Sequence, residues 1–146
     1  NNTYQIVQTA THVIIDVEMM HDVRIIRMEG EHRPAAVTQW LGDSVGRWQG
    51  DTLVVTTKGW NRQHGDYEPI FLSEQATVTE RFTRRGKDEI TYEFAVEDPG
   101  FYSQPWKGEM AFTPSNGPVY EFACHEGNYA LQHILQGARV REAASK

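Results

Sequence analysis

Two adjacent stretches decide the fold class: Thr77-Val-Thr-Glu-Arg-Phe-Thr-Arg84 and Glu89-Ile-Thr-Tyr-Glu-Phe-Ala-Val96. Both alternate apolar and polar residues, which is the period-2 pattern of a half-buried strand. The residues between them, Arg85-Gly-Lys-Asp88, are typical of a hairpin turn. The sequence therefore predicts two antiparallel strands, near residues 75–84 and 89–97, joined by a tight connection.

Short segments rich in Val, Ile, Thr, Tyr and Phe continue this pattern on either side. They predict further strands near residues 4–9, 12–20, 22–28, 45–49, 52–58, 107–113 and 119–125. Gly50-Asp51 and Asn116-Gly117 lie between neighbouring segments, and Asn-Gly favours the positive φ angles of a tight turn. Successive hairpins indicate a mostly β, antiparallel up-and-down barrel of about eight or nine strands, lipocalin-like, which forms a single domain over residues 1–146.

A helix is predicted from Tyr129 to Glu142, with Asn128 as its N-cap. Leu131, Ile134, Leu135 and Ala138 recur at helical spacing and share one face. We expect this face to pack across the outside of the barrel or to plug one end of it.

Composition excludes several classes of protein. Of the 146 residues, 39% are hydrophobic and 23% charged, as in a globular chain. No apolar run approaches the roughly 18 residues of a membrane-spanning helix. The net charge is −6 and no basic face is visible, so a nucleic-acid partner is not expected. A single cysteine, Cys124, cannot form an internal disulfide.

Strand periodicity places one carboxylate inside the predicted barrel. Ile90, Tyr92, Phe94 and Val96 share one face, which we expect to be the interior. Glu80 shares a face with Val78 and Phe82, so it points inward too. A buried carboxylate is costly without a partner. It can form an ion pair with Arg24 or Arg27, stay neutral at a raised pKa, or mark a functional site.

The leading functional hypothesis is a small-molecule enzyme of the lyase, isomerase or hydratase type, acting in the barrel cavity on an apolar or glycan-like ligand. Glu80 would be the acid/base group, helped by Tyr92, His21 or His125. The loops near residues 29–44 and 59–73 are long enough to line a ligand site. The residues assigned to ligand binding are Glu18, Arg24, Trp60, Trp106 and Glu121.

Three further sequence motifs give weaker indications of function. Residues 42–46 match G-x-S-x-G, but the strand-turn-helix context of a serine hydrolase is missing. The six histidines show no standard metal-ligand spacing, so no cofactor and no metal ligands are predicted, although a transition metal in a His/carboxylate site is kept as an alternative. Cys124-His125-Glu126 invites a thiol-enzyme hypothesis, but a lone cysteine is more often a small buried apolar residue.

Two segments resemble a family of uncharacterised bacterial exported proteins. They are the W-L-G-x-S-x-G-R-W-x-G-D-T-L-V-V stretch at residues 40–55 and the C-H-E-G-N-Y motif at residues 124–129. The resemblance implies a bacterial origin and a periplasmic or secreted location. It implies no chemistry, because no activity is established for the family.

Two other classes of function stay open. The first is a non-catalytic barrel that binds a small molecule. The second is an assembly domain in which the helix and exposed aromatic residues form a homodimer.

Overall fold

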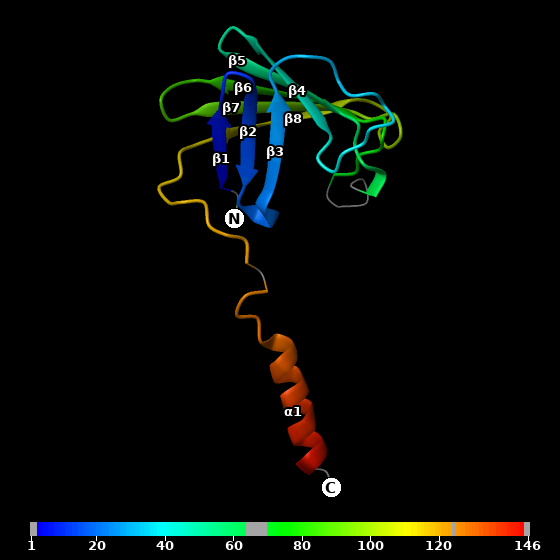
Figure 1. The fold of residues 1–146 in the computed structure, drawn as a ribbon, viewed down its shortest axis with the longest axis vertical. Coiled ribbons are helices and arrows are strands. Elements are labelled where there is room, and N and C mark those ends of the chain that lie inside the picture. Colours follow the sequence, from blue (N-terminus) through cyan, green and yellow to red (C-terminus); the bar gives the residue numbers. More distant parts are fainter. Residues whose placement is uncertain (1–2, 64–69, 124, 145–146) are drawn as a thin grey trace.

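The computed structural model describes residues 3–63, 70–123 and 125–144, and shows one curled sheet followed by a single helix (Figure 1). The sheet has eight strands in sequential order. These are β1 (Tyr4–Gln8), β2 (His12–Val17), β3 (Asp22–Arg27), β4 (Asp43–Gln49), β5 (Thr52–Lys58), β6 (Thr77–Arg84), β7 (Ile90–Glu97) and β8 (Trp106–Phe112). The mostly β class is confirmed.

The sheet is mixed and curls into a half-barrel that is not closed, so the predicted antiparallel up-and-down barrel is confirmed only as a curled, mostly antiparallel sheet. All neighbouring strands are antiparallel except β3 and β4, which run parallel and pair over two residues, Ile26 with Ser44 and Arg27 with Val45. The cause is the connection over residues 28–42. It carries the chain back to the starting end of β3, so that β4 begins in the same direction.

The two edges of the sheet, β1 and β8, are not paired with each other in the described structure. The Tyr4 and Phe112 rings stack across the opening with their centroids 5.3 Å apart. The predicted strand at 119–125 is also wrong, because residues 119–123 and 125 form no strand and no second arm of the Asn116-Gly117 hairpin exists there. A ninth strand is thus missing between the edges.

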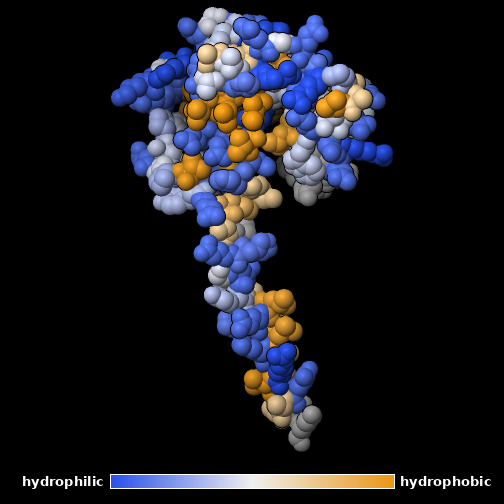
Figure 2. Space-filling model, viewed as in Figure 1, coloured by the Kyte–Doolittle hydropathy of each residue, from blue (hydrophilic) through white to orange (hydrophobic). Residues whose placement is uncertain are grey.

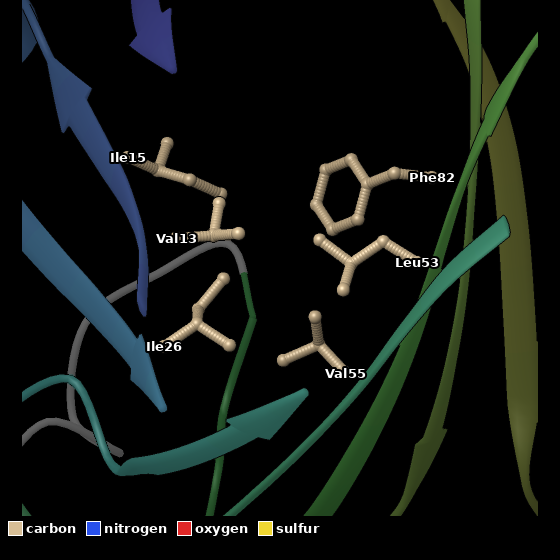
Figure 3. Packing of buried hydrophobic residues seen from close by; sticks show 6 residues of the cluster. All are labelled: Val13, Ile15, Ile26, Leu53, Val55 and Phe82. Carbon is tan, nitrogen blue, oxygen red and sulfur yellow. The ribbon is translucent and has the colours of Figure 1, made fainter. Parts of the chain in front are cut away.

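The interior side chains fall into three levels along the sheet. At one end lies an apolar cluster of Val13, Ile15, Ile26, Leu53, Val55 and Phe82 (Figure 3). At the other end Trp60, Leu72, Ala76 and Val96 form a second apolar cluster. Glu80 lies between Val78 and Phe82 on β6 and is 4% exposed, as its strand register predicts. A polar level therefore separates two apolar ones.

The strand predicted over residues 12–20 ends at Val17. Met19–His21 forms a 3-10 turn, in which Met20 and His21 have φ angles of 64° and 55°. This left-handed bend lets the chain reverse within a few residues and begin β3 at Asp22.

Helix α1 spans Ala130–Ala144, close to its predicted bounds. The side chain of Asn128 accepts a hydrogen bond from the Ala130 amide, as expected of a residue that caps a helix N-terminus. The expected packing on the barrel is not found: α1 has no buried residue and stands away from the sheet (Figure 1). No helix in the described ranges is long and apolar enough to span a membrane.

Candidate functional site

The concave side of the half-barrel holds a cavity of about 380 Å³. Six strands and the segment after β5 supply its walls, and most of its side chains are apolar or aromatic. Its lining consists of Tyr4, Ile15, Val17, Arg24, Trp60, Ile70, Leu72, Val78, Glu80, Phe82, Tyr92, Phe94, Val96, Met110 and Phe112. Such a volume and such a lining are typical of a small-molecule pocket.

Arg24 and Glu80 form the polar part of this wall. The Arg24 guanidinium donates from Nη1 to Glu80 Oε1 over 2.8 Å and from Nη2 to Glu80 Oε2, which makes a two-pronged ion pair. The Tyr92 hydroxyl donates to Glu80 Oε1 over 2.8 Å. The ion pair with Arg24, one of the partners that the sequence suggested for Glu80, is confirmed.

The second side of the Arg24 guanidinium is held by two hydroxyl groups. Nε donates to Ser44 Oγ over 2.9 Å and Nη2 donates to Thr57 Oγ1 over 2.7 Å, and these two oxygens lie 2.9 Å apart. The guanidinium carries five N–H donors. Acceptors among the described residues take four of them, which leaves one N–H on Nη1, and Arg24 itself is one of the residues that line the cavity.

Burial and charge act on these groups in opposite directions. Burial disfavours the charged form of Arg24, but the attraction and hydrogen bonds of Glu80 outweigh it and raise the pKa of Arg24. Burial, reinforced by the negative charge of Glu80, raises the pKa of Tyr92 far above its ordinary value. The wall therefore presents a charged but overall neutral pair beside a neutral phenol.

A second ion pair lies on the outer face, around Asp43. Arg27 Nη2 donates to both carboxylate oxygens over 2.9 and 2.8 Å, and the Arg33 amide donates to Oδ2 over 2.9 Å. His32 Nδ1 lies 3.2 Å from Oδ2. Burial alone would raise the pKa of Asp43, but these partners outweigh it and the pKa is lowered.

Both ion-pair networks connect strand β3 to strand β4. Arg24 and Arg27 both lie on β3, whereas Ser44 and Asp43 lie on β4. Both networks therefore cross the short parallel seam, where backbone pairing is limited to two residue pairs. They fasten the three-strand unit β1–β3 to the five-strand unit β4–β8.

The structure brings together four of the predicted site residues and separates the others. Arg24, Trp60, Glu80 and Tyr92 all line the cavity. The other five do not line it: His21, Glu121 and His125 are exposed, Glu18 is buried beside the 3-10 turn, and Trp106 packs against the second apolar cluster. His21 and His125 lie away from the cavity, and no sequence pattern had placed them on the interior face.

Sequence reasoning missed Ser44, Thr57 and Asp43. Strand parity could have found Thr57, because it follows Leu53 and Val55 on the interior face of β5. Ser44 was considered as part of G-x-S-x-G and belongs instead to the Arg24 network. No sequence pattern indicated a role for Asp43, because its partners His32 and Arg33 lie in the connection over residues 28–42, which has no regular hydrophobic period.

Metal ligation finds no support within the described ranges, where no group of three or more His, Cys, Asp or Glu side chains converges. Cys124, on which the thiol hypothesis depends, lies outside those ranges.

Comparisons with protein-family models, with curated proteins and with solved structures give no match.

Proposed function

We propose that this protein binds an uncharged, largely apolar small molecule in the concave cavity of its half-barrel, in a lipocalin-like manner. The observation that carries the proposal is the cavity of about 380 Å³, which is walled by aromatic and aliphatic side chains around one Arg24–Glu80 pair. Apolar walls supply affinity, and a few fixed polar groups supply orientation.

The charge of the site favours a neutral ligand. Arg24 is neutralised by Glu80, so the cavity wall offers no free charge for a carboxylate or an ammonium group. The remaining Arg24 N–H suits a single acceptor such as a carbonyl or ether oxygen. Aromatic rings of Trp60, Tyr92 and Phe94 suit a flat ligand.

The test uses the neutral fluorescent probe N-phenyl-1-naphthylamine and two variants on β6. Val78→Trp fills the cavity, whereas Thr79→Trp places the same side chain on the outer face. We expect Val78→Trp to raise the Kd of the probe at least about tenfold and Thr79→Trp to leave it within about twofold. Equal binding by the two variants would overturn the proposal.

A second candidate is the acid/base enzyme predicted from the sequence. It is favoured by the 2.8 Å contact between the Tyr92 hydroxyl and Glu80 at the cavity wall, although the Arg24 ion pair occupies the same carboxylate. The test is to identify a compound that copurifies with the protein and to follow it by mass spectrometry during incubation. An unchanged compound supports binding alone; conversion that is lost in Glu80→Gln supports the enzyme.

We also propose a periplasmic or secreted location in a bacterium, on the strength of the two motifs at residues 40–55 and 124–129. Fractionation of the source cells with an antibody to this chain tests the proposal. Recovery from the cytoplasm alone would refute it.

A further inference from the structure

Helix α1 exposes an apolar stripe that its own chain does not cover. Leu131, Ile134 and Leu135 are 70%, 65% and 48% exposed, and Ala138 lies on the same face. Figure 2 shows apolar side chains along the helix, which stands apart from the sheet. An isolated helix of 15 residues is marginal in water, because packing of an apolar face supplies most helix stability. The stripe therefore calls for a partner surface.

The outer face of β1–β3 exposes a second apolar surface. Val7 pairs with Ile14 and Ile14 with Ile25, so these three side chains form one row across three strands. Val7 is 43% and Ile25 is 57% exposed, and Val23, two residues from Ile25 on the same face of β3, is 48% exposed. Figure 2 shows apolar side chains gathered over these strands. We call Val7, Ile14 and Ile25 the outer row.

The two surfaces match in length, and charged residues of opposite sign lie near them. The stripe from Leu131 to Ala138 rises about 10 Å at 1.5 Å per residue. The outer row crosses two strand spacings, also about 10 Å. Arg139 and Arg141 lie on the same helix as the stripe, and Asp16 lies beside the outer row, between Gln5 and Val23.

We propose that the protein is a homodimer in which each copy places helix α1 on the outer row of the other copy. The occupant is a second copy because this chain itself carries both surfaces and holds them apart (Figure 1). Reciprocal docking of one surface on the other gives a closed two-fold dimer and buries both. The interface uses side chains that alternate with those of the cavity, so ligand binding and dimerisation lie on opposite faces of the sheet.

The experiment measures the mass of the full chain by sedimentation velocity over about 1 to 200 µM, since association depends on protomer concentration. We expect a dimer. Two disrupting variants are L131E/I134E in the stripe and Ile25→Glu in the outer row. Their matched controls are H133E/Q136E on the opposite side of the helix and Thr91→Glu on the outer face of β7. Each disrupting variant should raise the dimer Kd at least about 100-fold, and each control less than about threefold.

A mixing experiment distinguishes reciprocal docking of α1 on the outer row from other ways of forming a dimer. L131E/I134E keeps an intact outer row and Ile25→Glu keeps an intact stripe. Under the proposal each variant alone is monomeric, while an equimolar mixture forms a dimer through one intact interface. A monomeric full chain, a dimeric Ile25→Glu variant (which would indicate pairing of helices with each other) or a mixture that stays monomeric at the highest concentration would each overturn the proposal. Circular dichroism of every variant verifies that the sheet is folded.

Discussion

At the scale of single residues, the Arg24–Glu80 pair dominates the interior. Two buried charges are costly to remove from water, and their mutual attraction only roughly offsets that cost. Breaking such a pair is different, because the remaining charge stays buried without its partner. The hydroxyls of Ser44, Thr57 and Tyr92 make the other hydrogen bonds to this pair.

We predict that Glu80→Gln lowers the free energy of unfolding by about 3 kcal/mol, because it leaves the Arg24 guanidinium without a counter-charge. Tyr92→Phe removes a single hydrogen bond and should lower it by about 1 kcal/mol. Urea unfolding measures both values. The double variant R24M/E80L, which removes both charges, should be more stable than Glu80→Gln. If R24M/E80L were less stable than Glu80→Gln, the intact ion pair would itself stabilise the fold, and the loss in Glu80→Gln would not come from the unpaired Arg24 charge.

A pH prediction follows from Asp43. Its pKa is lowered in the folded protein, so the unfolded chain binds a proton more readily. The stabilisation is fully present above the ordinary carboxyl pKa of about 4 and is lost as the pH falls through the lower folded value. We expect Asp43→Asn to be less stable than the parent chain by about 2 kcal/mol at pH 7, with the difference shrinking below about pH 4. Thermal unfolding from pH 7 to pH 2 measures this, and a difference that does not change with pH would contradict it.

At the scale of elements, the sequence predicts which segments are strands better than how they are joined. Segments rich in β-branched and aromatic residues between turn residues located β1 to β8. Period-2 alternation predicted the inward face of β6 and β7, because burial of one face imposes it directly. It could not predict that β3 and β4 are parallel, since alternation is the same in either direction. The same alternation at 119–125 gave a strand that the structure does not form, because pattern alone does not provide a pairing partner.

The candidate site was partly predictable for the same reason. Glu80 and Tyr92 lie on long, regular strands, where parity fixes the direction of the side chain. His125 and Glu121 lie in a segment without strand pairing, so the parity argument had no basis there. Trp60 lies in the segment after β5 and lines the cavity. Its assignment to ligand binding came from the length of that loop and from its aromatic side chain.

Gly108 on β8 leaves room for the ring of its β7 partner, Phe94. A Cβ on Gly108 would lie 2.6 Å from the Phe94 ring, which lines the cavity. We therefore expect Gly108→Ala to push this ring, lowering the free energy of unfolding by about 1 to 2 kcal/mol and weakening probe binding. Gly86→Ala is the matched control, because no atom lies within 4 Å of its added Cβ. Urea unfolding and probe titration of both variants measure the effect; similar behaviour of the two would contradict it.

At the scale of the whole molecule, stability should be graded from the centre of the sheet to its edges. β5 pairs with β4 and β6 along nearly its full length, whereas β1 and β8 each pair on one side. Amide hydrogen exchange should be slowest in β5 and β6 and fastest at the unpaired sides of β1 and β8. Protection of the edge strands equal to that of β5 would indicate that another segment pairs with them.

The short seam between β3 and β4 has a consequence for the integrity of the chain. The first three strands are tied to the other five by the shared apolar cluster, two backbone residue pairs, the two arginine networks and the connection over residues 28–42. If a protease cut that connection, the two pieces would persist as a non-covalent complex held by the apolar cluster and the two ion pairs, and acid would weaken the ionic part by protonating Asp43. The protein thus has a natural point for division into complementing fragments, and their reassembly would report whether the seam has formed.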